Sequence, residues 1–143
     1  MNYRVKWGQR DEVYRDAAAL RTEIFVDEQK FVEEFDSIDE VALHMVIYDE
    51  DNTPIATGRL FEEENGTWHI GRICVKKHLR GMGLGRIIVE ELEKKALELN
   101  ASRIILGAQT RVRGFYETLG YRACGEEYYE EYCLHIPMEK LFK

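Results

Sequence analysis

Three glycines at every second position, Gly81, Gly83 and Gly85, form the part of this sequence best suited to binding a phosphate. Glycine has no Cβ, so the backbone there can turn sharply and lie close to a ligand. Arg80 and Arg86 flank the glycines, and a helical pattern of apolar residues follows them. The first turn of a helix leaves N–H groups unpaired, and its dipole favours anions. The stretch therefore predicts a phosphate cradle; the alternative is a tight turn from strand to helix with solvated basic residues.

The spacing around these glycines excludes two common phosphate-binding motifs. A P-loop ends in Lys followed by Ser or Thr, whereas this loop ends in Arg86 and Ile87. The dinucleotide fingerprint needs a third glycine three residues after the second, and that position is again Arg86. What remains is the pattern R-x-x-G-x-G, with Arg80, Gly83 and Gly85 in register.

Length and composition are those of an ordinary globular protein. The chain has 143 residues, of which 45% are hydrophobic and 33% charged, so we expect one domain over residues 1–143. No apolar run approaches the roughly 18 residues of a membrane helix, and the N-terminal segment lacks the apolar stretch of a signal peptide. Cys74, Cys124 and Cys133 show no Cys-x-x-Cys spacing, so neither a disulfide framework nor a zinc site is predicted. We expect a cytoplasmic protein that does not bind membranes.

Charge is distributed unevenly along the chain. The net charge of −7 argues against nucleic-acid binding. Residues 65–89 contain no acid but five Lys or Arg, whereas Asp27 to Glu40 contains seven acids and one Lys. Such asymmetry can guide an anionic cofactor to one region and a cationic acceptor to another. For the acidic region, a solvated loop is the alternative.

The sequence predicts a mixture of strands and helices around the glycine stretch. Apolar alternation, helical apolar spacing and turn residues predict the elements. They are strand 2–7, helix 11–27, an irregular segment 27–40, strands 41–48, 54–63 and 67–75, helix 84–99, strand 103–108, helix 111–119, and strands 121–124 and 132–138. The strand at 103–108 follows a crossover helix and should lie parallel to the strand at 67–75. The sequence thus predicts one mixed α/β sheet.

A second motif lies downstream, R-G-F-Y-E-T-L-G-Y from Arg113 to Tyr121. Together with R-x-x-G-x-G, it closely resembles the GNAT N-acetyltransferase superfamily. The order β-α-β-β-β-α-β-α-β-β resembles the GNAT fold over the whole chain, which implies that strands four and five are parallel and splayed. Shorter stretches resemble a narrower branch, the small bacterial ElaA/YjcF-like acetyltransferases: I-F-V-D-E-Q at 24–29, Asp36 with Asp39, His44, and Ala108 with Gln109.

The resemblance implies an acetyl-CoA site, with acetyl-CoA as co-substrate and no metal. The residues expected to form it are Ile73, Cys74, Val75, Arg80, Gly81, Met82, Gly83, Leu84, Gly85, Arg86, Gln109, Val112 and Phe115. In the family, a backbone N–H at the bulge of the fourth strand stabilises the oxyanion, and Ile73 to Val75 match that backbone. Tyr116 matches the acid that protonates the departing thiolate. Its alternative is a half-buried helix aromatic with its hydroxyl in water.

The base that takes the proton from the amine is left open. Many GNAT enzymes use a Glu of the fourth strand, but Gly71 and Arg72 occupy the candidate positions here. Other candidates for the base or for acceptor binding are Glu28, Asp36, Asp39, His44 and His135, each of which has a structural or solvated alternative. A water chain is a further option.

Cys74 raises the alternative of a covalent acetyl-cysteine. Nothing nearby in the sequence marks an activating base, and a small buried strand residue is the better account. Direct transfer is therefore the expectation.

We expect an acetyl-CoA-dependent N-acetyltransferase that transfers the acetyl group directly to a primary amine in a ternary complex. The acceptor would be a small molecule or a protein amine, and the family allows a homodimer. The alternative is a GNAT-fold module that binds acyl-CoA for regulation without efficient transfer, which the missing strand carboxylate supports. The two failed phosphate motifs weaken a third reading, a nucleotide-binding protein.

Overall fold

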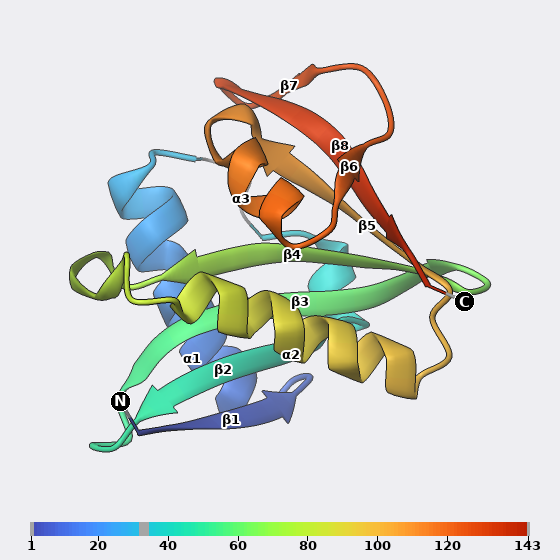
Figure 1. Ribbon diagram of the computed structural model, residues 1–143. Coiled ribbons are helices and arrows are strands. Elements are labelled where there is room, and N and C mark those ends of the chain that lie inside the picture. Colours follow the sequence, from blue (N-terminus) through green and yellow to red (C-terminus); the bar gives the residue numbers. More distant parts are fainter. Residues whose placement is uncertain (1, 32–34, 143) are drawn as a thin grey trace.

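The computed structural model describes residues 2–31 and 35–142, built around one mixed sheet (Figure 1). The strand order is β1-β2-β3-β4-β5-β8-β6, and β7 pairs with β8 alone. Only β4 and β5 pair in parallel among these neighbours. The strands are β1 Tyr3–Gly8, β2 Leu43–Asp49, β3 Pro54–Glu64, β4 Thr67–Val75, β5 Arg103–Gln109, β6 Arg122–Ala123, β7 Tyr128–Glu130 and β8 Cys133–Leu141.

Helices cover both faces of the sheet, α1 on one and α2 with α3 on the other (Figure 1). They are α1 Glu12–Arg21, which continues as a π-helical segment Thr22–Glu28, α2 Leu84–Glu98 and α3 Arg113–Thr118. Short 3-10 turns cover Ser37–Glu40, Lys77–Leu79 and Thr110–Val112. Asp11 caps α1 as the sequence suggests, accepting hydrogen bonds from the N–H groups of Val13 and Tyr14. None of the helices described here is long and apolar enough to cross a membrane.

The core has two parts because both faces of the sheet are covered. Ile88 and Leu92 of α2 are fully buried against the sheet, as is Ile47 of β2. On the other face, Leu20 of α1 packs with Val46 of β2. Neighbouring residues of β2 thus enter opposite halves of the core, which explains the nearly continuous apolar run in that strand.

Strands β4 and β5 pair along only part of their length. Thr67–His69 pairs with Arg103–Ile105, and beyond these residues the two strands diverge. Over the divergent part, β4 carries a bulge against β3, since Thr57 faces Cys74 but Arg59 faces Gly71. The diverging strands leave an opening in the middle of the sheet.

The predicted mixed sheet, with parallel and splayed fourth and fifth strands, is confirmed. Several details differ. The expected helix 11–27 changes to π-helical geometry at Thr22, and the expected helix 111–119 starts as a 3-10 turn. The expected strand 41–48 begins at Leu43, the expected strand 121–124 is reduced to Arg122–Ala123, β8 extends to Leu141, and β7 was not predicted at all. The sequence around β7, E-E-Y-Y-E-E, is too polar to show the alternation of a half-buried strand.

Candidate active site

A cleft of about 960 Å³ lies where β4 and β5 diverge. Its walls come from both faces of the sheet. Ile73, Val112 and Phe115 line it from the side of α2, and these residues pack against the core of that face. Cys74 and Phe31 line it from the side of α1. The cleft therefore connects the two faces, which we call its α2 side and its α1 side.

The predicted phosphate cradle stands beside this cleft at the start of α2. Gly81 and Gly83 both have φ +84°, a conformation that side-chain-bearing residues rarely adopt. A Cβ added to either residue would meet no described atom within 4 Å, so the space above the turn is open. The first N–H groups of α2 begin directly after Gly83. This open turn at a helix N-terminus fits a pyrophosphate.

Arg80 directly precedes the glycine loop, and hydrogen bonds within the protein hold its side chain. Its Nε donates to the carbonyl of Val75 at 3.0 Å, and its two terminal nitrogens donate to the Glu28 carboxylate at 2.7 and 2.9 Å. The bidentate bond lowers the pKa of Glu28 and raises that of Arg80. Arg80 thus ties the loop to β4 and to the π-helical segment.

The bulge of β4 places unusual backbone at the cleft. Arg72 has φ +51°, the left-handed region that costs a non-glycine residue free energy. The next residues alternate, with Ile73 and Val75 packed on the α2 side and Cys74 on the α1 side. All three line the cleft, and the role predicted for their backbone, facing the thioester, stays a prediction.

Tyr116 lies on the α2 side, 8% exposed, and lines the cleft. Its ring makes edge contacts with Phe115 and Tyr121, at centroid distances of 5.1 and 5.9 Å. Burial raises the pKa of its hydroxyl to about 12. Tyr116 therefore stays protonated across the neutral pH range, as a proton donor must.

On the α1 side, Gln109 of β5 and His135 of β8 are directly opposite each other in the ladder. The Gln109 amide donates to Gln29 at 3.0 Å and accepts a hydrogen bond from Arg111 at 2.9 Å. Tyr128 of the unpredicted β7 stacks on the His135 ring, with centroids 5.6 Å apart. These residues form a second polar group across the sheet from Tyr116.

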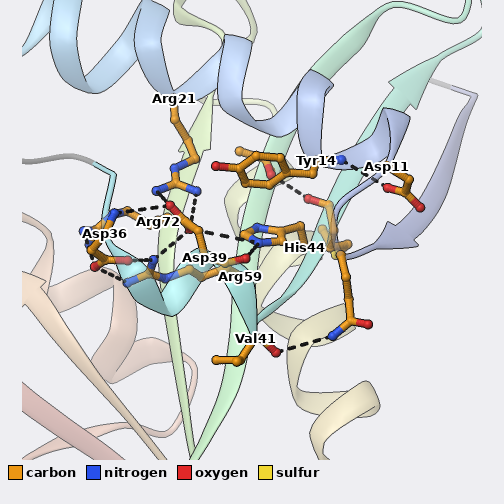
Figure 2. Close-up of polar contacts among 12 residues, drawn as sticks. Asp11, Tyr14, Arg21, Asp36, Asp39, Val41, His44, Arg59 and Arg72 are labelled. Atoms are coloured by element: carbon orange, nitrogen blue, oxygen red, sulfur yellow. Dashed lines mark hydrogen bonds and ion pairs between the residues drawn. The ribbon is translucent and has the colours of Figure 1, made fainter.

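A buried ion-pair network closes the α1 side of the site (Figure 2). Asp39 accepts hydrogen bonds from Arg21 at 2.8 and 3.1 Å and from Arg59 at 2.9 Å. Asp36 accepts from Arg59 at 2.8 Å and from Arg72 at 3.3 Å. Burial by itself would raise the pKa of both carboxyl groups, but the arginines outweigh it and lower both pKa values.

His44 belongs to the same buried network. Its Nε2 donates to the carbonyl of Asp39 at 3.1 Å, and its ring packs edge-on against Tyr14. The side chain is fully buried, and burial lowers the pKa of the imidazole. Neither His44 nor Asp39 lines the cleft. These two predicted site residues are thus placed in the supporting core.

The structure brings most of the predicted site residues together. Those that line the cleft are Asp36, Ile73, Cys74, Val75, Arg80, Gln109, Val112, Phe115, Tyr116 and His135. The rest of the glycine loop, Gly81 to Arg86, stands beside it, and Glu28 is bound to Arg80. No cluster of metal-ligating side chains occurs among residues 2–31 and 35–142.

Most of the described carboxylates in the acidic segment are paired within the protein. Glu28, Asp36, Asp39 and Glu40 each form an ion pair with an arginine from another element. Asp27 is exposed, and Glu33 and Glu34 lie outside the described residues, so the expectation of a cationic acceptor stays a prediction.

Several cleft residues carry no sequence signal of their own. Phe25, Phe31, Phe35 and Phe61 line the α1 side with Tyr128. Each reads as an ordinary core or loop aromatic in the sequence, and only the tertiary fold brings them to one wall. Arg59 resembles an ordinary strand residue in the same way, although it is 4% exposed and connects both aspartates of the network.

A parallel strand pair that splays around a cleft, with a glycine turn and helix N-terminus beside it, defines the acyl-CoA N-acyltransferase fold. The family model of the acetyltransferase (GNAT) domain matches residues 10–142. The chain is 38% identical over 133 residues to the uncharacterised N-acetyltransferase YjcF of Bacillus subtilis, covering 91% of this chain and 94% of YjcF.

Solved structures agree with this assignment. A crystal structure from Lactobacillus plantarum matches with a TM-score of 0.92 and 26% identity over 100% of both chains. Escherichia coli ElaA shares the fold, with a TM-score of 0.83 and 23% identity over 96% of this chain and 99% of ElaA. The chain belongs to the GNAT acetyltransferase family, in its ElaA/YjcF-like branch, whose fold implies an acyl-CoA co-substrate.

Proposed function

We propose that this protein is an acetyl-CoA-dependent N-acetyltransferase that transfers the acetyl group directly to a primary amine. The observation that carries the proposal is a single cleft open to both faces of the sheet. The glycine turn lies at the start of α2, and the polar pair Gln109 and His135 lies on the α1 side. Such a cleft admits two substrates from opposite faces so that they meet at β4.

The residues of the α2 side suit an extended CoA. Gly81 and Gly83, with the first N–H groups of α2, would hold the pyrophosphate. Val112 and Phe115 give an apolar wall for the pantetheine arm, and Gln109 lines the cleft across from them, on the α1 side. When bound, acetyl-CoA supplies the activated acetyl group.

The chemistry needs three groups. A lysine-like amine is about 0.1% neutral near pH 7.4, a handicap of roughly 4 kcal/mol that a base must offset. A backbone N–H of the bulged stretch Ile73 to Val75 would stabilise negative charge on the carbonyl oxygen. Tyr116 would donate its proton toward the leaving sulfur.

The effect of Tyr116 should be moderate. A free thiol has a pKa near 8.5, whereas burial raises the pKa of Tyr116 to about 12. Complete proton transfer from Tyr116 to the thiolate is therefore uphill, and a hydrogen bond in the transition state is the larger part of its action. We expect a contribution of about 10²-fold.

The second candidate is an acyl-CoA-binding module without efficient transfer. One observation favours it: β4 carries Gly71 and Arg72 where many family members carry a Glu. Cys74 favours neither candidate function. The structure places it in a buried cluster of apolar residues, which does not favour the reactive thiolate that a covalent acetyl-cysteine would need.

Release of CoA from acetyl-CoA across a panel of amines separates the two functions. The panel contains tyramine, putrescine, glucosamine, a free amino acid and a lysine peptide. Transfer predicts release with at least one amine, and Tyr116→Phe should lower kcat about 10²-fold while the Kd for acetyl-CoA changes little. Tight binding with no release for any amine would favour the module. Equal kcat for both proteins at every pH would remove Tyr116 from the mechanism.

A further inference from the structure

The ring of His135 is held in one defined tautomer at the cleft. Its Nδ1 lies 3.0 Å from the carbonyl oxygen of Cys133. A carbonyl oxygen can only accept, so Nδ1 carries the hydrogen and Nε2 carries the lone pair. No residue in the described part of the chain hydrogen-bonds Nε2. The side chain is 5% exposed and lines the cleft, which leaves Nε2 as an accepting nitrogen at the site.

The fold fixes the ring from three sides. β8 lies between β5 and β7 at this level, so His135 faces Gln109 on one side and Tyr128 on the other. Tyr128 stacks on the ring with an interplanar angle of 26°. The Tyr128 hydroxyl occupies the space that a Cβ on Gly107 would fill. The tyrosine that stacks on His135 therefore also packs against β5. The ring has little freedom to turn Nε2 away.

Along the sheet, His135 lies at the open end of the cleft, where β4 and β5 no longer pair. Pairing of β4 with β5 stops at Ile105, four residues before Gln109, which is the partner of His135. Cys74 is on the same α1 side, at the end of β4 beyond the bulge. His69, the other histidine that lines the cleft, is at the closed end beside Ile105 and stacks on Phe61.

The other candidates for the base are engaged elsewhere. Glu28 is bound bidentately by Arg80, and Asp36 is bound by two arginines. Both carboxylates have a lowered pKa, which makes them weak bases. Asp39 and His44 lie in the buried network away from the cleft. His135 is the one predicted candidate that both lines the cleft and has an accepting atom not bound to a described cation.

We propose that His135 is the general base, an inference that rests on the proposed function. Nε2 takes a proton from the bound ammonium, and the neutral nitrogen then attacks the acetyl carbonyl carbon. The C–N bond forms, the attacking nitrogen releases its second proton to water, the C–S bond breaks, and the sulfur receives a proton from Tyr116. His135 then releases its proton to water and Tyr116 regains one from water, so each turnover releases one proton in total. The base acts from the α1 side and the acid from the α2 side.

Several ionisable or polar groups near the His135 ring could affect the pH profile of kcat. β7 contributes Tyr128 and Glu130, the 3-10 turn before α3 contributes Arg111, and β5 presents the neutral Gln109. β8 itself carries Cys133. Burial raises the pKa of Tyr128, so this hydroxyl stays neutral across the neutral pH range.

His135→Asn is the test variant, because an Asn amide can still donate to the Cys133 carbonyl but has no atom at the place of Nε2. With the fastest amine of the panel, we expect kcat to fall about 10²- to 10⁴-fold with an unchanged Kd for acetyl-CoA. The acidic limb of the pH profile of kcat should disappear. The deficit should shrink as pH approaches the pKa of the amine, where the neutral amine forms without help.

The matched control is His78→Asn, which changes an exposed histidine outside the cleft and should keep wild-type kinetics. Parallel pH profiles for wild type and His135→Asn, at any ratio of rates, would show a structural role and overturn the proposal. So would a normal rate in the variant.

A second measurement needs no acceptor. Long-range ¹⁵N–¹H NMR spectra distinguish the two imidazole tautomers, and the signal missing in His135→Asn identifies this ring among the four histidines. The Nδ1–H form is expected. An Nε2–H form would refute the general base even if no amine in the panel is acetylated, whereas an inactive panel with the Nδ1–H form would count against the proposed function alone.

Discussion

Replacing Asp39 by Asn tests how much the buried network on the α1 side of the cleft stabilises the fold. The Asp39 side chain is 6% exposed, and those of Arg21 and Arg59 are 1% and 5% exposed. Asn keeps the size of the side chain but replaces one accepting oxygen with an N–H group. That group would face guanidinium N–H groups, which also only donate. The substitution therefore leaves buried positive charge without its counter-charge.

The expected cost is large compared with the stability of a domain. Removing one partner of a buried ion pair typically costs about 3–5 kcal/mol, against a total of roughly 5–15 kcal/mol. At about 3 °C per kcal/mol for a chain of this length, Tm should fall by roughly 10–15 °C. The penalty exceeds one hydrogen bond because two arginines, not one, bind this carboxylate.

Urea unfolding followed by circular dichroism gives the free energy of unfolding for both proteins. Glu40→Gln is the matched control, because Glu40 lies one residue away but pairs with Arg10 in solvent, where both side chains are at least 60% exposed. It should cost less than about 0.5 kcal/mol. A loss below about 1 kcal/mol for Asp39→Asn, or equal losses for both variants, would refute the reasoning.

The network also predicts a pH signature. The folded-state pKa of Asp39 is lowered from its usual value of 3.8, so its stabilisation is present above that value and is lost as pH falls through the folded-state pKa. The free energy of unfolding of the wild type should therefore decline more steeply below pH 4 than that of Asp39→Asn. Equal slopes in urea titrations at acidic pH would contradict this assignment.

Three further predictions concern the glycine loop and the bulge of β4. Gly83→Asp should abolish measurable acetyl-CoA binding in calorimetry, since it adds a negative charge and a strained φ to the cradle; an intact Kd would disprove the cradle. Gly85→Ala places a Cβ 3.3 Å from the Phe115 ring at the cleft, so we expect weaker acetyl-CoA binding, while Gly114→Ala, with open space, should leave binding unchanged. In urea titrations, the free energy of unfolding of Arg72→Gly should exceed that of Arg72→Ala by about 1 kcal/mol, because only glycine accepts φ +51° freely. The reverse order would mean that the bulge relaxes.

Much of the fold follows from local sequence patterns. Asp11 before a helical apolar pattern gave the start of α1, and Gly120 after Leu119 gave the end of α3. Strand β4 was predicted with its observed bounds, because a turn at Asn65 and Gly66 precedes an apolar strand that the glycine loop follows. The glycine loop itself was readable because its conformation depends on local backbone freedom.

The parts that could not be predicted depend on contacts between distant segments. Arg59 and Asp39 are 20 residues apart and meet only when the segment before β2 folds over β3. Arg80 and Glu28 are 52 residues apart. A charged residue has the same appearance in a sequence whether it is solvated or buried against a partner, so the acidic stretch read as an open surface.

The missing carboxylate of β4 acquires a physical explanation from the same contacts. Arg72 occupies the bulge in a left-handed conformation, and its guanidinium is 3.3 Å from Asp36, which Arg59 also holds. A strained residue of this kind persists where its surroundings fix it. The position thus serves to hold the bulged backbone of β4 at the cleft, and it carries a cation rather than a group that could accept a proton. Placing the proton acceptor on β8 separates the two tasks, because the ring of His135 is oriented by a neutral carbonyl and a stacked tyrosine rather than by a charge.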